Sequence, residues 1–262
     1  MHSRDQVYEI ELMSGGTLIA VGLGPGDPEL ITVKALRALE RAGAVAYFAK
    51  AGNQSHAHAI AAAHLRPDVP KLPLLYPVTI ELDHKGEPYR RAICDFFDQS
   101  AAAVAHELDR GITVAVICEG DPLFYGSYMH LHERLAPRYR TEVIAGVTGM
   151  SGCWSSVGTP IAQGDDVFTV LPGTLAEEEL ARRIGDTDAA VIMKVGRNLP
   201  KVRRALARAG RLERALYVER GTMNGAKTMR LADKRDDVAP YFAIVLVPGW
   251  ESRQGTGTGA GT

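Results

Sequence analysis

The sequence predicts an α/β protein built from two α/β domains. A short apolar strand, a glycine-rich turn and an amphipathic helix follow one another in residues 17–43. A second strand-like run occupies residues 112–118, and further apolar runs alternate with helical patterns from about residue 161. A length of 262 residues is sufficient for two such domains. The expected parts are an N-terminal extension (1–16), a first domain (17–160), a second domain (161–250) and a disordered tail (251–262).

The first strand and its turn have the character of a ligand-binding loop. Leu18 to Val21 form an apolar run typical of a strand buried on both faces. Gly22, Gly24 and Gly26 then alternate with other residues, so the backbone can take positive φ and lie open to a ligand. The spacing matches neither the dinucleotide-binding nor the phosphate-loop pattern. Taken alone, the loop is equally compatible with a tight packing turn.

A second turn of the same kind follows the most strand-like run, Ile112 to Cys118, which we expect at the centre of the sheet. Its residues are Glu119, Gly120, Asp121 and Pro122. Ligands of open parallel sheets lie beyond the carboxyl ends of the strands, so this turn and the Gly22 turn should be neighbours. Two Gly-Asp-Pro turns at strand ends favour a binding site over packing alone.

The remaining elements follow from apolar periodicity, and a mixed second sheet is compatible with the pattern. Further strands are expected near 44–49, 74–80, 142–145, 167–171, 189–195, 215–219 and 242–247, and helices near 28–42, 55–65, 89–110, 129–135, 146–158, 176–184 and 200–209.

Composition excludes several classes of protein. The 30 basic and 31 acidic residues nearly cancel, so no general attraction to nucleic acid or to an anionic membrane is expected. The three cysteines lie far apart, which argues against a disulfide framework and fits a reducing compartment. His56, His58 and His64 lack zinc-site spacing, so no metal is expected. Without a signal-peptide pattern or a membrane-spanning run, we expect a cytoplasmic protein.

Five motifs together carry a resemblance to a known family. They are VGLGPGDPELITVKA, CEGDPLFYGS, AGVTGM, VIMKVG and VERGT, in an order that covers nearly all of the folded chain. The chain resembles the tetrapyrrole methyltransferases that use S-adenosylmethionine. EGDPLFYGSY, GMSGCWSSVGTP and PYFAIVLV look most like the branch that methylates the C20 meso carbon of precorrin-2 in cobalamin synthesis. The resemblance implies two α/β domains with the cofactor in a cleft between them.

The resemblance also implies site residues. Those that would line the cofactor are Pro25, Glu119, Gly120, Asp121, Tyr125, Thr148, Met193 and Gly221. Many relatives have glycine at the position of Glu119 and alanine at that of Gly221. The family commonly uses backbone groups at these places.

The implied reaction is attack of an electron-rich meso carbon on a sulfonium methyl group, which needs little acid or base help. A carboxylate could accept the meso proton that leaves afterwards, and Asp27 is the candidate. Asp27 followed by Pro28 is also typical of a helix N-cap. The substrate has eight carboxylates and needs cations. The candidates are Lys50, Lys194, Arg197, Arg220, Lys201 and Lys227, with Tyr241 against the macrocycle.

The sequence is also compatible with several other functions and substrates. A nucleotide-dependent oxidoreductase would use the glycine loop for pyrophosphate, although the spacing is wrong for it. Other possibilities within the family are a uroporphyrinogen methyltransferase, a diphthine synthase and a ribosomal RNA ribose methyltransferase. A carrier would bind the tetrapyrrole without methylating it. The substrate could be metal-free precorrin-2 or cobalt-factor II. Relatives are commonly dimers, so a homodimer is expected.

Overall fold

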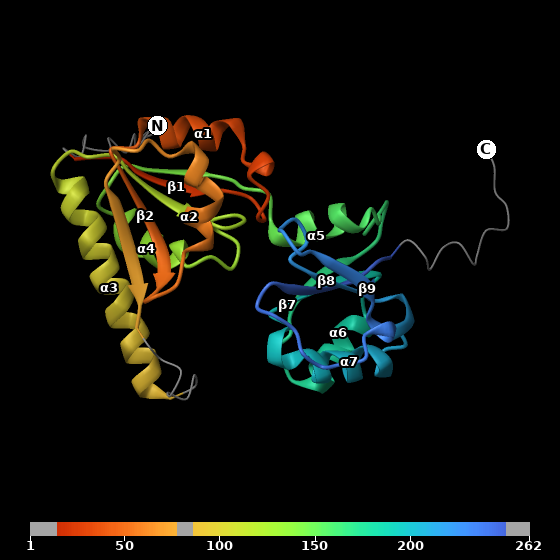
Figure 1. Ribbon diagram of the computed structural model, residues 1–262. Coiled ribbons are helices and arrows are strands. Elements are labelled where there is room, and N and C mark those ends of the chain that lie inside the picture. The colour runs from red at the N-terminus through yellow and green to blue at the C-terminus, as the bar shows by residue number, and fades with distance from the viewer. Residues whose placement is uncertain (1–14, 78–85, 250–262) are drawn as a thin grey trace, which may run out of the picture. The chain divides into compact units, whose positions relative to one another are not determined.

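The computed structural model describes residues 15–77 and 86–249, and these divide into two compact units. The first unit contains the described residues up to Val147, except Pro25–Asp27. The second contains Pro25–Asp27 and the described residues from Thr148 onwards. Figure 1 follows the chain by colour. The division lies one helix earlier than the boundary proposed at residue 160. The N-terminal extension up to residue 14, the tail and the end of the strand proposed at 74–80 lie outside the described residues.

A five-stranded parallel sheet forms the first unit, in the order β3-β2-β4-β1-β5. The apolar runs predicted to be strands are confirmed, and β4 is central as expected. Every residue of β1 and β4 is buried, which explains why these strands are continuously apolar rather than alternating. The strands are β1 (Leu18–Gly22), β2 (Ala44–Lys50), β3 (Lys71–Tyr76), β4 (Val114–Cys118) and β5 (Thr141–Ile144).

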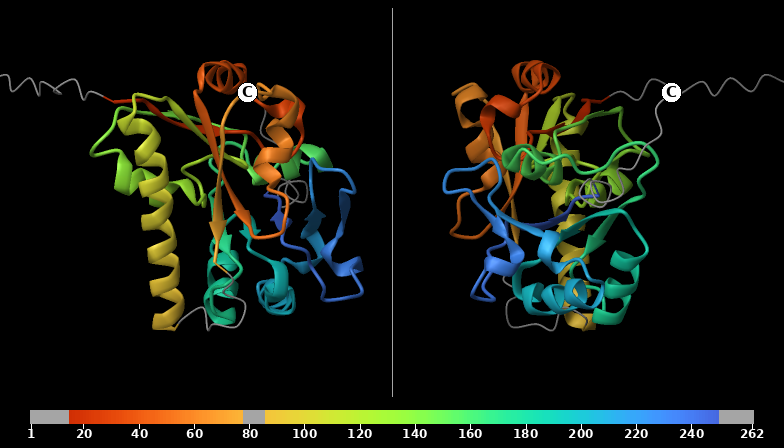
Figure 2. Two further views of the ribbon diagram at one scale, coloured as in Figure 1. Left: turned by 60° about the vertical axis from the view of Figure 1, so that its left-hand side comes forward. Right: turned by 90° about the vertical axis from the view of Figure 1, so that its right-hand side faces the viewer.

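Helices cover both faces of this sheet. On one face, α1 (Val33–Arg41) and α2 (His56–Ala61) pack against alternate strand residues such as Ile19. On the other face, α3 (Glu87–Asp109) and α4 (Tyr128–Leu135) pack against the intervening residues, such as Leu18. Figure 2 shows α3 as one long helix. The first unit is therefore a three-layer α/β fold whose strands all end at the same edge.

The start of α1 differs from the prediction. Thr32 is its N-cap, and the Thr32 Oγ1 accepts the Ala35 N–H at 3.1 Å. Pro28–Leu30 instead form a separate 3₁₀ turn, in which the Ile31 N–H reaches back to the Pro28 carbonyl. The interpretation of Asp27 as the N-cap of this α-helix is wrong, because the tighter i to i+3 bond ends the turn before an α-helix can form.

The second unit contains a mixed five-stranded sheet in the order β6-β7-β10-β8-β9. The first two strands are parallel, and β10 runs antiparallel to both β7 and β8. The edge strand β9 was not predicted, because its exposed KTMR residues carry no apolar pattern. The strands are β6 (Phe168–Pro172), β7 (Ala189–Met193), β8 (Leu216–Glu219), β9 (Lys227–Arg230) and β10 (Ala243–Val247).

This second sheet is also covered on both faces. The helices α6 (Glu177–Gly185) and α7 (Leu199–Arg208) pack on one face, around buried residues such as Tyr217. On the other face lies α5 (Gly149–Val157), whose Cys153 packs against Val191 and Val218. The second unit thus has its own core.

The burial of the cysteines predicts their reactivity. Cys94 is exposed, whereas Cys118 and Cys153 are buried. Burial raises the pKa of the Cys118 thiol well above its ordinary value and raises that of Cys153 to about 11. We expect Ellman's reagent to label Cys94 alone in the native protein at pH 8, and all three thiols in guanidinium. Cys94→Ser should abolish the native reaction. Rapid labelling of a second thiol would contradict the buried positions.

Candidate functional site

The turns after β1 and β4 lie side by side, as predicted. Gly22 is aligned with Cys118 in the sheet, and the Leu23 N–H donates to the Cys118 carbonyl at 2.9 Å. Beyond the strands, the Gly120 N–H donates to the Gly24 carbonyl at 2.7 Å, and a weaker bond of 3.4 Å runs the other way. Two glycine-rich turns therefore form one continuous backbone surface at the carboxyl edge of the first sheet.

Close backbone contacts explain the glycines of this edge. A Cβ on Gly22 would lie 2.5 Å from the Gly146 nitrogen and 2.8 Å from the Gly120 carbonyl oxygen. Gly24 and Gly120 have φ values of 83° and 64°, which L-amino acids rarely adopt. Three chain segments thus meet with no side chain between them. The name glycine cradle is used below for Gly22, Gly24, Gly120 and Gly146.

The Asp121 carboxylate forms hydrogen bonds to two of the segments that meet at the glycine cradle. One oxygen accepts the Leu123 N–H at 2.9 Å and the other accepts the Gly146 N–H at 3.1 Å. The side chain therefore connects the turn after β4 to the segment after β5. Both oxygens are engaged by the protein's own backbone, so the carboxylate has a structural task.

Glu119 is turned towards α2. Desolvation raises the pKa of its carboxyl above the ordinary value, while His56 and a hydrogen bond from the Ala57 N–H act in the opposite direction. The residue as a whole is exposed to solvent. Its neighbours place the carboxylate at the N-terminus of α2, where negative charge is favourable.

Two other predicted residues of the first unit lie at the same edge of the sheet. Lys50 ends β2, which is adjacent to β4, and its side chain is exposed. Tyr125 follows the turn after β4, and its ring packs against that of Phe124 at 4.9 Å between centroids.

A second group of predicted residues meets in the second unit. A Cβ on Gly152 would lie 2.6 Å from Cγ of Pro25, and one on Gly221 would lie 2.7 Å from the Cys153 sulfur. Thr148 is the N-cap of α5, the helix that carries both contacted positions, and its Oγ1 accepts the Ser151 N–H at 3.3 Å. Pro25, Thr148 and Gly221 thus lie around one helix.

Thr222 lies beside the same helix, α5, and was not predicted from the sequence as a site residue. Its methyl carbon would lie 3.0 Å from a Cβ on Gly152, and its Oγ1 would lie 3.3 Å from one on Gly26. The hydroxyl is buried, and no hydrogen-bond partner for it is found among the residues described. The signal that could have identified it is its place as the last residue of the VERGT motif.

Most of the remaining predicted residues lie at one edge of the second sheet, whereas Lys201 lies in α7. Because β10 is antiparallel to both β7 and β8, these two strands end at the same edge, where β10 begins. The Arg220 N–H donates to the Phe242 carbonyl at 2.9 Å across this edge. Arg197 lies in a short 3₁₀ turn after β7, and its side chain is exposed. The group at the edge comprises Met193, Lys194, Arg220 and Tyr241.

Backbone conformation distinguishes three of these residues. Within residues 15–77 and 86–249, the non-glycine residues with positive φ are Tyr125, Lys194 and Arg220, at 54°, 55° and 51°. A left-handed backbone is unfavourable for such side chains and persists where the surrounding structure imposes it, often at functional sites. Tyr125 was predicted from the resemblance to the family, and Lys194 and Arg220 were predicted for their charge at strand ends.

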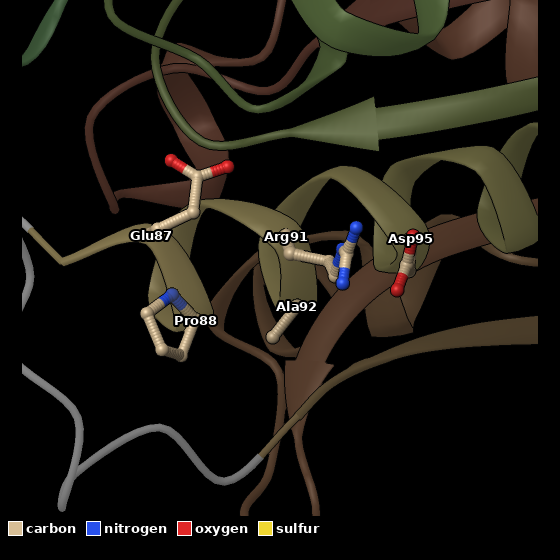
Figure 3. Close-up of a pocket in the computed structure, with 5 residues that line it drawn as sticks. All are labelled: Glu87, Pro88, Arg91, Ala92 and Asp95. Atoms are coloured by element: carbon tan, nitrogen blue, oxygen red, sulfur yellow. The ribbon is translucent and has the colours of Figure 1, made fainter.

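Three other observations bear on whether the described residues form a separate pocket, a metal site or a membrane-spanning helix. The hollow in Figure 3 lies against the first turns of α3, and its lining contains none of the predicted residues. The described residues contain no cluster of three or more histidine, cysteine or acidic side chains that could hold a metal. In the same part of the chain, every helix is too short or too polar to cross a membrane. The lining of the hollow is Glu87, Pro88, Arg91, Ala92 and Asp95.

Comparison with known proteins identifies the family. Residues 17–233 match the family model of the tetrapyrrole (corrin/porphyrin) methylases. The chain belongs to the tetrapyrrole methylases. A precorrin-2 C(20)-methyltransferase from Sinorhizobium is 62% identical over 92% of this chain and 100% of its own length. A cobalt-precorrin-2 C(20)-methyltransferase from Salmonella typhimurium is 29% identical over 88% of this chain and 96% of its own.

A solved tetrapyrrole methylase has the same fold. The uroporphyrin-III C-methyltransferase of Thermus thermophilus, complexed with S-adenosylhomocysteine, superimposes with a TM-score of 0.61 at 22% identity. The alignment covers 90% of this chain and 100% of that structure. The predicted family and its α/β fold with two sheets are therefore confirmed.

The close contacts in the glycine cradle predict that adding one methyl group at Gly22 destabilises the protein. Gly22→Ala should lower the free energy of unfolding by about 1–3 kcal/mol, because the new Cβ overlaps the backbone of Gly146 and Gly120. Urea denaturation measures the change. Gly185→Ala is the matched control, since its Cβ meets nothing within 4 Å and φ is not positive there. Equal stability of the two variants would contradict the close approach.

Proposed function

We propose that this tetrapyrrole methylase transfers a methyl group from S-adenosylmethionine to the C20 meso carbon of precorrin-2, giving precorrin-3A in cobalamin biosynthesis. The observation that carries the proposal is the 62% identity to the Sinorhizobium enzyme over that enzyme's full length. Identity to the Salmonella enzyme, named for cobalt-precorrin-2, is 29%, which favours the metal-free substrate over cobalt-factor II. Family membership also removes the support for an oxidoreductase.

The residues present suit the proposed cofactor. The glycine cradle presents backbone without Cβ atoms, and Gly26 has a φ of 140° beside the buried Thr222 hydroxyl. Backbone groups of this kind can contact a ligand closely. The S-adenosylhomocysteine in the Thermus family member supports the same cofactor for this chain. The residues proposed to line it are Pro25, Glu119, Gly120, Asp121, Tyr125, Thr148, Met193 and Gly221.

S-adenosylmethionine bound here would supply a methyl group on a positively charged sulfur, and S-adenosylhomocysteine would leave as the electron-rich meso carbon bonds to that methyl group. The protein then has to hold the reacting carbon in line and exclude water. Side chains of Glu119 and Asp121 are engaged by the backbone of Ala57, Leu123 and Gly146. We therefore assign cofactor contact at these two positions to their backbone groups.

Asp27 is proposed to accept the proton that leaves the meso carbon after methyl transfer. It is not the N-cap of α1, because Thr32 has that role. Its turn groups with the second unit, where Pro25 packs beside Gly152. A carboxylate placed next to proposed cofactor contacts is suitably located for proton transfer.

The substrate's carboxylates are proposed to bind cations of the two strand edges. Lys194 and Arg220 follow the ends of β7 and β8, the two strands that flank β10 in the second sheet, and both backbones are held in the left-handed region. Tyr241 lies beside them, is 86% exposed and offers a ring to the macrocycle. Lys50 at the end of β2 and Arg197 after β7 complete the set proposed to bind substrate.

We also propose a cytoplasmic homodimer. Three cysteines without a disulfide suit a reducing compartment. The dimer rests on the resemblance to the family alone.

Methyl transfer can be tested directly. The protein is incubated with labelled S-adenosylmethionine and either precorrin-2 or cobalt-factor II. We expect precorrin-2 to gain one methyl group, located at C20 by mass and NMR analysis. A variant lacking Asp27, Asp27→Asn, should bind S-adenosylhomocysteine normally and turn over more slowly. Methylation at another carbon, or stabilisation by NAD rather than by S-adenosylhomocysteine in a thermal-shift assay, would contradict the proposal.

The strained lysine offers a second test, because its two properties can be separated. Lys194→Gly should raise the free energy of unfolding by about 0.5–1 kcal/mol, since glycine adopts the left-handed backbone without strain. Lys194→Met removes the charge and keeps the strain. Both variants should raise the KM for the tetrapyrrole about tenfold through loss of a charge-assisted hydrogen bond. An unchanged KM in both would exclude Lys194 from substrate binding.

A further inference from the structure

The Thr222 hydroxyl has no assigned role in the site described so far. Its Oγ1 is buried, and residues 15–77 and 86–249 provide no hydrogen-bond partner for it. An unpaired buried hydroxyl destabilises a fold, and native proteins seldom retain one unless a ligand, an ion or a water completes it. The position of this residue therefore calls for a partner that the described part of the chain does not supply.

The orientation of Thr222 is set by packing on both sides. Its methyl carbon is directed to Gly152, beside the ring of Pro25, and its hydroxyl is directed to Gly26. The chain direction is set by a turn in which the Met223 N–H donates to the Arg220 carbonyl at 2.7 Å. The hydroxyl thus faces the Pro25–Asp27 turn, next to two positions proposed above for cofactor contact, Pro25 and Gly221.

The surroundings of this hydroxyl indicate which part of a ligand it would meet. The Met223 side chain and the hydroxyl both lie over Gly26, the Pro25 ring lies with the Thr222 methyl carbon at Gly152, and the buried thiol of Cys153 lies against the preceding residue, Gly221. The Arg220 Nη1 would lie 3.8 Å from a Cβ on Gly225. Apolar walls with one hydroxyl suit a flat heteroaromatic ring with a polar edge better than a charged amino-acid group.

We propose that the Thr222 hydroxyl forms a hydrogen bond to the adenosine half of S-adenosylmethionine. This inference rests on the proposed function. Met223 lies beside the hydroxyl, and its unbranched side chain can move aside as the ligand enters. A hydroxyl can donate to a ring nitrogen or accept from an amino group, so it matches the polar edge of adenine.

Two readouts test the proposal on the full chain. The first is the Kd of S-adenosylhomocysteine and of 5′-methylthioadenosine, which lacks the amino-acid half, by titration calorimetry. The second is the urea midpoint of the ligand-free protein. Thr222→Val removes the hydroxyl and keeps the shape, Thr222→Ser keeps the hydroxyl, and Thr228→Val alters an exposed threonine of β9 as the matched control.

Thr222→Val should raise both Kd values by about tenfold and raise the urea midpoint, because the unpaired hydroxyl is gone. Thr222→Ser should bind within about twofold of the wild type, since the hydrogen-bonding group remains, and the control should change neither readout. Wild-type affinity in Thr222→Val would overturn the inference and show that the hydroxyl binds water. A loss for S-adenosylhomocysteine alone would overturn the adenosine assignment. Failure of the wild type to bind S-adenosylhomocysteine would overturn the proposed function itself.

Discussion

The structure of the first unit depends on a close contact between backbone segments at the carboxyl edge of its sheet, where glycines leave no side chain between them. Gly22, Gly120 and Gly146 belong to segments that follow three adjacent parallel strands, and they approach closely enough that a Cβ on Gly22 would overlap both neighbours. Hydrogen bonds between Gly24 and Gly120 and from Gly146 to Asp121 hold the segments at this distance. The Gly-Asp-Pro sequence of the second turn follows from these demands: glycine for the left-handed backbone, and aspartate to accept two amides.

Among the described residues of the second unit, two that are not glycine have the strained left-handed backbone. Lys194 and Arg220 take left-handed backbone at the ends of strands that flank β10. A glycine would suit either backbone better, so the retention of long cationic side chains at an energetic cost favours a role for their charge. Their neighbours support the same view: the Lys194 carbonyl accepts the side-chain N–H of Asn198, and Arg220 is bonded through its own amide to Phe242. The backbone is hydrogen-bonded at both positions, and both residues are exposed.

Most of the fold could be predicted from the sequence, because buried parallel strands are continuously apolar and glycine marks their ends. What could not be predicted depends on tertiary context. The N-cap of α1 was misplaced because Asp27 and Thr32 are both good caps, and only the 3₁₀ turn between them decides which one is used. The strand Lys227–Arg230 was missed because an exposed edge strand has no apolar pattern. Thr222 was missed because an unpaired hydroxyl is visible only once its neighbours are placed.

The Glu119 side chain connects the turn after β4 to the start of α2. The carboxylate accepts the Ala57 N–H at the start of α2, near His56. Ser55 already accepts the His58 N–H, so the short helix α2 has two caps from different parts of the chain. Lys50 precedes that helix by a few residues. The carboxylate thereby couples the turn after β4 to the segment that carries Lys50. Because the side chain is engaged at α2, the cofactor contact proposed at Glu119 is assigned to its backbone groups.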